Sequence, residues 1–227
     1  MWNNILNFFA GINWPEIWKA TLETLYITSV STILSYLIGL PLGIVLTNTD
    51  KNGITPCPVV YKILDVIINI LRSAPFIILM ILVIPLTRLI VGKSYGPTAT
   101  IVPLVIGASP FIARMVESSL KEVDHGVIEA AQSLGATNMK IVVSVLLKEA
   151  RTSLIVGVTI AFGTILGYSA MAGTIGGGGL GTLAVNYGYY RYKTNVMVIT
   201  LVILILLVQI VQWAGMALAK KLDRRVR

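Results

Sequence analysis

The chain has 227 residues, of which 56% are hydrophobic and only 12% charged, and its mean hydropathy is +0.83. Soluble domains carry roughly 25% charged residues, so this composition argues against a soluble globular domain, and the apolar content argues against disorder. One cysteine cannot form a disulfide scaffold, and half of the net charge of +8 lies in residues 220–227, which suits a membrane-flanking tail better than a nucleic-acid groove. We therefore expect an all-α integral membrane protein that contacts lipid and binds no nucleic acid.

Five membrane-spanning helices are predicted, because a helix needs about 20 apolar residues to cross the hydrocarbon and the chain has enough long, weakly charged runs. Residues 1–20 are rich in tryptophan and phenylalanine, so we expect them to lie on the outer interface. A single transmembrane domain follows over 21–219, and the basic tail is 220–227. The spans are expected at about 22–46, 63–91, 96–113, 152–172 and 195–219.

The distribution of basic residues predicts the orientation. With five spans, the two termini lie on opposite sides of the membrane. Five Lys and Arg residues then share the side of the N-terminus and twelve share the side of the C-terminus, and positive charge favours the cytoplasm. The N-terminus is therefore predicted outside and the C-terminus in the cytoplasm.

Arg72 is the costliest residue in the predicted spans. If the second span begins near Lys62, Arg72 is buried and must face a cavity or a partner. Asp65 would then lie about 10 Å away along the same helix, too far to pair with it. If Pro75 begins a helix, Arg72 lies at the cytoplasmic interface, and this is the placement that we favour.

The only long polar insertion, 114–151, falls on the cytoplasmic side and is predicted to be structured. Asp124 can cap a short helix, Gly135 can end it in a left-handed turn, and Thr137 can begin a second helix that leads into the fourth span. Apolar residues recur at helical spacing between these signals: Val127, Ile128, Ala131 and Leu134. Such an amphipathic helix either rests on its own helical bundle or docks into a groove of a partner.

The same loop resembles the cytoplasmic signature of permease subunits of bacterial ABC importers. The resemblance lies in Glu129-Ala130-Ala131, in Gly135 after them, and in Val145 and Leu147. Lys148 stands where this family usually has proline, so the second helix can run unbroken into the fourth span. Further segments extend the resemblance from about residue 21 to the end of the last span: 72–79, 101–104, 110–117, 167–171, 178–181 and 187–189. Among them, Gly167-Tyr168-Ser169-Ala170-Met171 is similar to methionine-importer permeases in particular.

This resemblance implies a permease that forms a homodimer, pairs with two copies of an ATPase subunit and receives substrate from an extracytoplasmic binding protein or lipoprotein. It implies import of methionine, in one or both enantiomers, across the bacterial cytoplasmic membrane by alternating access; another small amino acid or a peptide is an alternative substrate. The helix between spans 3 and 4 would be the coupling helix that sits in a cleft of the ATPase. Its contact residues would be Glu129, Ala130, Ala131, Leu134, Gly135 and Ala136.

The sequence predicts no catalysis by this chain. It has no G-x-x-x-x-G-K-[ST] phosphate loop, so we expect no cofactor here, and ATP and magnesium on the partner ATPase. Gly176, Gly178 and Gly181 spell G-x-G-x-x-G, but no strand is predicted before them. One histidine and one cysteine cannot supply a metal site. Acids are scarce within the spans, which disfavours an ion-coupled carrier or a channel acting alone; a non-transporting scaffold is a third alternative.

Two groups of residues are candidates for the transport pathway. Tyr168, Ser169, Met171 and Phe76 would supply polar and soft groups in an otherwise inert wall, although core packing is the commoner role of methionine. The fourth span should end near Ala172, because each glycine in a helix costs about 1 kcal/mol relative to alanine. The glycines that follow are predicted to form a tight, mobile turn or a re-entrant segment, which is either a simple external loop or an outer gate or docking surface: Gly176, Gly177, Gly178, Gly179 and Gly181.

Overall fold

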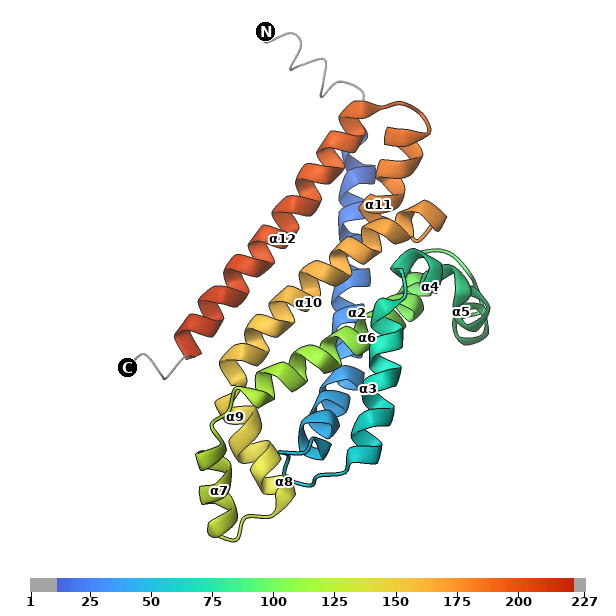
Figure 1. The fold of residues 1–227 in the computed structure, drawn as a ribbon. Coiled ribbons are helices and arrows are strands. Elements are labelled where there is room, and N and C mark those ends of the chain that lie inside the picture. Colours follow the sequence, from blue (N-terminus) through green and yellow to red (C-terminus); the bar gives the residue numbers. More distant parts are fainter. Residues whose placement is uncertain (1–11, 223–227) are drawn as a thin grey trace. The chain divides into compact units, whose positions relative to one another are not determined.

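The computed structural model describes residues 12–222, and within this range the regular elements are helices, which confirms the all-α prediction for these residues (Figure 1). The longer helices are α2 (Trp14–Thr49), α3 (Pro58–Ser73), α6 (Pro97–Lys121), α10 (Arg151–Ala172) and α12 (Thr194–Leu222). The shorter ones are α4 (Phe76–Leu82), α5 (Ile84–Val91), α7 (His125–Ser133), α8 (Asn138–Ile141), α9 (Leu147–Glu149) and α11 (Gly179–Leu183). A 3-10 helix, η2 (Gly173–Ile175), and two π-helices, η1 (Val142–Leu146) and η3 (Ala184–Tyr189), connect some of them.

Four of the described helices, α2, α6, α10 and α12, are long and apolar enough to cross a membrane, and the pair α3 and α4 adds a fifth if it counts as one broken span. The stretch 63–91 is therefore not one helix, as a single predicted span suggests, but is divided among α3, α4 and α5. The break has a local cause. Ala74 is extended, at φ −71° and ψ 130°, because the ring of Pro75 disfavours a helical residue before it. A helix starts directly after Pro75, as in the placement favoured for Arg72, which is exposed in this chain.

Two helix ends differ from their predicted positions. α6 continues to Lys121, about two turns past the expected end at residue 113, so the polar loop is shorter than 114–151. α2 begins at Trp14, so the later part of the predicted interfacial segment 1–20 is continuous with the first span. Residues 1–11 of that segment, and the end of the basic tail from residue 223, lie outside the described residues.

The second loop helix runs into α10 almost without a break. Only Ala150 separates α9 from α10, and its amide still donates a hydrogen bond to the carbonyl oxygen of Leu146 at 2.9 Å. In η1 the amide of Leu147 donates to the carbonyl oxygen of Val142, so this turn holds one residue more than an α-helical turn. With Lys148 in place of a proline, no ring removes an amide donor from this stretch.

The chain forms two compact units. Unit 1 comprises Met1–Thr32, Phe76–Val105 and Phe162–Val211, and unit 2 comprises Ile33–Pro75, Ile106–Ala161 and Gln212–Arg227. An apolar cluster in unit 1 joins three helices through Ile17 and Ala20 of α2, Leu180 and Leu183 of α11, and Val196 and Ile199 of α12. A cluster in unit 2 joins three others through Leu46 of α2, Ile68 of α3 and Ala113 of α6.

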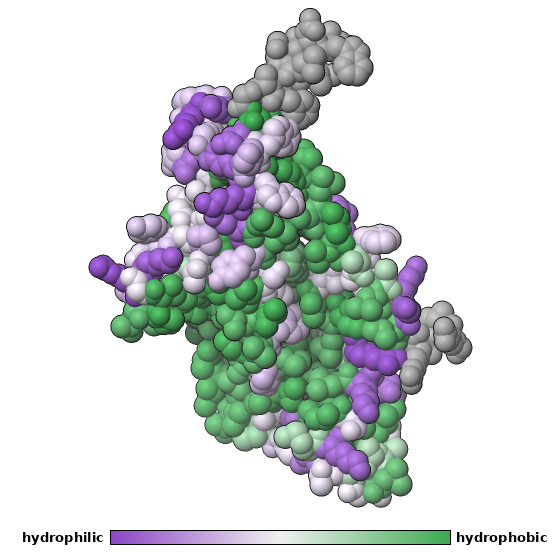
Figure 2. All heavy atoms as spheres, turned by 180° about the vertical axis from the view of Figure 1, so that it is seen from behind, coloured by the Kyte–Doolittle hydropathy of each residue, from purple (hydrophilic) through white to green (hydrophobic). Residues whose placement is uncertain are grey.

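Much of the surface of the chain is apolar. Hydrophobic side chains, in green, cover large parts of the face shown in Figure 2. Several of the largest are more than half exposed, among them Leu37, Leu82, Leu89, Ile210 and Trp213. A soluble monomer rarely exposes so much apolar surface, whereas lipid or partner helices would cover it.

Gly43 allows α2 to pack closely on α6 within unit 2. A Cβ at this position would lie 2.6 Å from Cβ of Val116 and 2.7 Å from the carbonyl oxygen of Ala113. We therefore expect Gly43→Val to lower the free energy of unfolding by about 1–3 kcal/mol, as overpacking commonly does. The measurement is the thermal unfolding midpoint of the purified protein in detergent. Gly167→Val is the matched control, because a Cβ there meets nothing within 4 Å; equal losses in both variants would contradict the packing argument.

Candidate functional site

Helix α7 occupies the position at which the sequence predicts a coupling helix. Its N-terminus is capped by Asp124, whose carboxylate accepts a hydrogen bond from the amide of Gly126 at 2.8 Å. Gly135 follows its end with φ +76°, in the left-handed region. The structure confirms both predicted signals. Thr137 precedes α8, but its side chain makes no capping hydrogen bond.

No side chain of α7 is buried. Among the predicted contact residues, Glu129, Ala130 and Gly135 are exposed, and Leu134 is 88% exposed. Ala131 and Ala136 are half-buried. A loop helix that rested on its own bundle would bury its apolar face, and α7 does not do so. Its open surface of small and apolar residues is suited to a groove in a partner.

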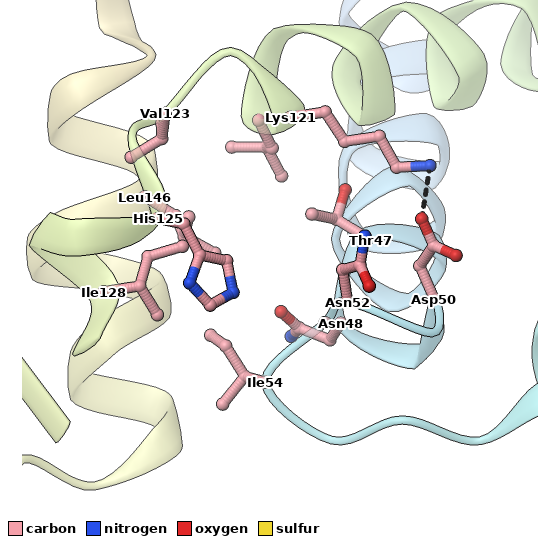
Figure 3. A pocket seen from close by; sticks show the side chains of 12 residues that line it. Thr47, Asn48, Asp50, Asn52, Ile54, Lys121, Val123, His125, Ile128 and Leu146 are labelled. Atoms are coloured by element: carbon pink, nitrogen blue, oxygen red, sulfur yellow. Dashed lines mark ion pairs between the residues drawn. The ribbon is translucent and has the colours of Figure 1, made fainter.

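A cavity of about 420 Å³ opens beside α7 in unit 2 (Figure 3). Helix α7 contributes His125 and Ile128 to its wall. The other lining residues come from the end of α2 and the loop after it, from the end of α6 and its following turn, and from η1: Thr47, Asn48, Asp50, Asn52, Gly53, Ile54, Leu120, Lys121, Val123 and Leu146. The start of α7 is therefore not packed solidly against the loop that follows α2.

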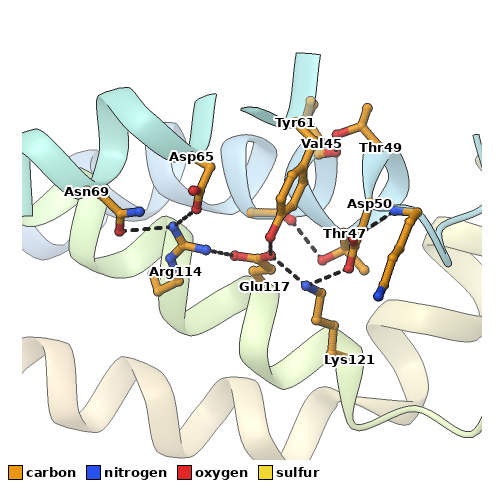
Figure 4. Close-up of polar contacts among 12 residues, drawn as sticks. Val45, Thr47, Thr49, Asp50, Tyr61, Asp65, Asn69, Arg114, Glu117 and Lys121 are labelled. Carbon is orange, nitrogen blue, oxygen red and sulfur yellow. Dashed lines mark hydrogen bonds and ion pairs between the residues drawn. The ribbon is translucent and has the colours of Figure 1, made fainter. Parts of the chain in front are cut away.

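Charged residues at the end of α6 form an ion-pair network in unit 2 (Figure 4). Glu117 is its centre, and its side chain is only 3% exposed. The carboxylate accepts hydrogen bonds from Nη1 of Arg114 at 2.7 Å and from the hydroxyl of Tyr61 at 3.2 Å, and it pairs with Nζ of Lys121 at 2.8 Å. One buried anion is thus shared by two cations and a phenol, which satisfies a charge that burial would otherwise make costly.

Both cations of this network also reach an acid on another segment. Arg114 pairs with Asp65 of α3, and Lys121 pairs with Asp50, directly after α2, at 2.7 Å. The hydrogen bond from Lys121, assisted by the backbone amide of Lys51, lowers the pKa of Asp50 below its usual value despite some desolvation. Asp50 therefore stays ionised at neutral pH, and the network ties α3 and the loop after α2 to the end of α6.

Sequence reasoning missed this network for a specific reason. Arg114, Glu117 and Lys121 are three and four residues apart, which places them on one face of a helix. That spacing was the available signal, but the third span was predicted to end at residue 113, so these residues were placed in a loop. The partner of Asp65 is Arg114 on another helix, and spacing along the chain predicts only pairs within one helix.

In unit 1 the structure brings together two of the four predicted pathway residues. The rings of Phe76 on α4 and Tyr168 on α10 stack with their centroids 4.2 Å apart and an angle of 7° between their planes. Ser169 is buried, and its hydroxyl donates to the carbonyl oxygen of Leu166 at 2.8 Å, so this group is used within α10. Met171 is 50% exposed.

The glycine segment after α10 is a tight turn, and hydrogen bonds attach it to α6 and to the residue before that helix. Gly176, Gly178 and Gly179 have φ values of +79°, +88° and +68°, which residues other than glycine rarely adopt. The hydroxyl of Thr100 donates to the carbonyl oxygen of Gly177 at 2.9 Å. The amide of Gly96 donates to the carbonyl oxygen of Gly176 at the same distance.

Helix α2 holds the other end of this turn. The carboxylate of Glu23 accepts a hydrogen bond from the amide of Gly179 at 3.0 Å, and the hydroxyl of Thr24 accepts one from Leu180 at 2.8 Å. A Cβ on Gly181 would lie 2.7 Å from Cα of Ala170, so the glycine also permits close packing. These contacts favour an anchored turn over the mobile one that the sequence predicts. Sequence reasoning missed this contact, because Glu23 and Gly179 are 156 residues apart in the chain.

The polar groups of these two regions are mostly engaged in joining helices. Among residues 12–222, no group of three or more His, Cys, Asp or Glu side chains could hold a metal ion. The fold and these regions define a multi-pass α-helical membrane protein with an exposed loop helix in unit 2 and an anchored glycine turn in unit 1.

Comparison with known proteins gives the family. Residues 39–227 match the family described as the binding-protein-dependent transport system inner membrane component, and the chain belongs to this family. It is therefore a multi-pass protein of the inner membrane and a transport permease.

Relatives cover almost the whole chain. The probable D-methionine transport system permease protein MetI of Vibrio cholerae is 47% identical over 223 residues, which are 98% of this chain and 99% of the relative. The methionine import system permease protein MetP of Bacillus subtilis is 40% identical over 218 residues, which are 96% and 98% of the two chains.

Solved structures agree with these relatives. A chain of the MetNI methionine ABC transporter in an inward-facing conformation has a TM-score of 0.91 and 45% identity, and the match covers 94% of this chain and 100% of that one. An amino acid ABC transporter solved with histidines has a TM-score of 0.75 at 19% identity, with 97% and 98% coverage, and shares the fold alone.

Removal of the central anion tests the ion-pair network. Glu117→Ala leaves Arg114 and Lys121 without their shared acceptor, so we expect the free energy of unfolding to fall by about 1–3 kcal/mol. The measurement is the unfolding midpoint in detergent. Glu149→Ala is the control, because Glu149 is an exposed acid of the same unit. An unchanged midpoint in Glu117→Ala would show that the network does not stabilise the fold.

Proposed function

We propose that this chain is the membrane-spanning subunit of an importer that moves methionine into the cell with energy from a separate ATPase. The observation that carries the proposal is near full-length similarity to permeases named for methionine transport, at 47% and 40% identity, together with the fold of the MetNI transporter at a TM-score of 0.91. One relative is named for D-methionine and the other for methionine, which supports transport of both enantiomers. Another small amino acid or a peptide is the alternative substrate.

The charges of the two units support the proposed orientation, with the N-terminus outside and the C-terminus in the cytoplasm. Every loop predicted to lie outside belongs to unit 1, and every loop predicted to lie in the cytoplasm belongs to unit 2. Unit 1 contains five of the 18 Lys and Arg residues and unit 2 contains thirteen. Because cytoplasmic segments carry the excess of positive charge, this distribution supports the proposal that the loops of unit 2 face the cytoplasm.

Helix α7 is the proposed contact with the ATPase. It is exposed, it belongs to the basic unit, and its open surface includes Ala130 and Leu134. Only three residues separate it from α6, and the ion-pair network joins α6 to α3. A displacement of α7 by the ATPase would therefore be passed to both helices. We propose a complex of two copies of this chain and two ATPase subunits that hold ATP and magnesium, working by alternating access.

The transport pathway is proposed to run beside Phe76 and Tyr168, with Ser169 and Met171 on the same stretch of α10. The stacked pair supports this, because stacked aromatic rings attract each other and join α4 to α10 at this position. The anchored glycine turn, which lies in the same unit, would close the outer end.

Reconstitution into liposomes tests the proposed function. We expect uptake of L- and D-methionine that requires ATP, the ATPase and the binding protein together, and that a non-hydrolysable ATP analogue abolishes. Uptake by this chain alone, driven by an ion gradient, would show a carrier instead. If another amino acid is taken up more strongly than methionine when the two compete, that amino acid is the substrate. No uptake with all partners present would refute transport.

A bulky side chain on α7 tests the coupling contact. Ala130→Trp should lower the stimulation of the ATPase by substrate-loaded binding protein at least about tenfold, equivalent to about 1.4 kcal/mol, because the indole would block a close fit in the partner's groove. Folding should be unaffected, since Ala130 is exposed. Gln132→Trp places the same side chain on the opposite face of the helix and serves as the control. Retained stimulation in Ala130→Trp would contradict the coupling role.

A further inference from the structure

Four cations lie close together where α12 ends, in unit 2 and apart from the ion-pair network. Lys220 and Lys221 are in the last turn of α12. Nη2 of Arg151, the first residue of α10, donates a hydrogen bond to the carbonyl oxygen of Leu222 at 2.7 Å, so the end of α12 and the start of α10 lie side by side (Figure 1). Lys148 is three residues before Arg151, about one helical turn away. We refer to Lys148, Arg151, Lys220 and Lys221 as the basic cluster.

The lysines of the basic cluster are available to a ligand. All three are exposed, and none of them forms an ion pair within the described part of the chain, whereas Arg114 and Lys121 are each paired with two acids. The guanidinium of Arg151 has five N–H donors, and its bond to Leu222 uses one of them.

The basic cluster has more positive than negative charge around it. Two acids lie nearby: Glu149, and Glu122, which accepts a hydrogen bond from Ser153. Four cations against two acids leave a surplus of two positive charges, and residues 223–227 add three arginines and one aspartate in sequence. Lys148 stands where the family usually has proline, so this chain has one cation more at this point than the family pattern supplies.

Helix α12 offers an open apolar surface next to these cations. Only 17% of its most apolar stretch is buried, against 61% in α6. Trp213 is 77% exposed and is seven residues before Lys220, which places both on one face of α12, about 10 Å apart along the axis. Tryptophan is enriched at membrane interfaces, so the cations beyond Trp213 are at the level of the lipid headgroups. A phospholipid with its headgroup at Lys220 would lay its acyl chains along Trp213.

We propose that the basic cluster binds the headgroup of an anionic phospholipid in the leaflet at which α12 ends. Lysines and arginines directly beyond a membrane helix attract anionic lipids, and unpaired cations form charge-assisted hydrogen bonds with phosphate oxygens. The bond of Arg151 to Leu222 fixes one group of donors beside the two lysines of α12. A free phosphate would use the same donors, but it would gain nothing from the exposed apolar side of α12 around Trp213, so the observations favour a lipid.

Quenching of Trp213 fluorescence measures this binding directly. Trp2, Trp14 and Trp18 are replaced by phenylalanine, and the full chain is placed in liposomes with either dibrominated phosphatidylglycerol or dibrominated phosphatidylcholine at the same mole fraction. Bromine atoms in the acyl chains quench a nearby indole. We expect the apparent affinity for phosphatidylglycerol to exceed that for phosphatidylcholine roughly tenfold at low salt. This preference should largely disappear at about 1 M salt, where charges are screened within about 3 Å.

Substitution of the lysines shows whether the basic cluster is responsible. Lys148→Gln, Lys220→Gln and Lys221→Gln together should remove most of the preference, while arginine at the same three positions should preserve it. The control removes the same charge from three exposed lysines on other elements of the same unit: Lys51→Gln, Lys62→Gln and Lys140→Gln. The unfolding midpoint should be equal in all of these variants.

Four outcomes would overturn the lipid site. Equal quenching by the two lipids in the chain with its native lysines would show that no anionic lipid is preferred. An equal loss of preference in the control would show a response to total charge alone. Disappearance of the preference when inorganic phosphate replaces chloride at equal ionic strength would show a site for free phosphate. Disappearance on addition of the proposed ATPase would assign these lysines to a protein interface. None of these measurements depends on methionine uptake, so the lipid site and the proposed function can fail independently.

Discussion

The carboxylate of Glu117 is the interaction on which the form of unit 2 depends. Two cations on the same face of α6 would repel each other and draw water, but this buried anion lies between them and accepts from both. The last turns of α6 therefore stay helical as far as Lys121. Arg114 also pairs with Asp65, and Lys121 also pairs with Asp50, so α3 and the loop after α2 acquire fixed positions against α6. The start of α7 follows from this, because its cap, Asp124, lies three residues beyond the network.

Unit 1 meets a different constraint. A turn with buried backbone, such as that around Gly177 and Gly179, needs hydrogen-bond partners for its amides and carbonyls. The glycine turn obtains them from side chains of neighbouring helices: Thr100 donates to a carbonyl, and Glu23 and Thr24 accept amides. An ionisable residue within an apolar helix is costly, and the role of Glu23 as a hydrogen-bond acceptor explains its presence there.

The sequence was sufficient wherever a feature depends on neighbours along the chain. Composition predicted an all-α membrane protein, the cap at Asp124 and the left-handed Gly135 were recognised from local patterns, and motifs gave the family. Features that depend on pairing between helices were missed. The charge of Arg114 predicts an end of the third span at residue 113, because the sequence alone does not show that Arg114 pairs with Asp65 on another helix. The prediction that Pro75 begins a helix places Arg72 at the interface, but the predicted span 63–91 runs through this proline, whereas Ala74 before it is extended.

The π-helical turn η1 changes how the residues on either side of it are to be compared. Each residue of an α-helix advances the side-chain direction by about 100°, so one additional residue in a turn shifts the phase of everything beyond it by about that amount. A helical wheel drawn from Asn138 to the first turns of α10 would therefore assign the two ends to the wrong sides of the cylinder. Because of this offset, the side-chain face of the loop helix does not continue in line as the face of α10. The loop helix and the span can therefore bury different faces although they share one nearly continuous backbone.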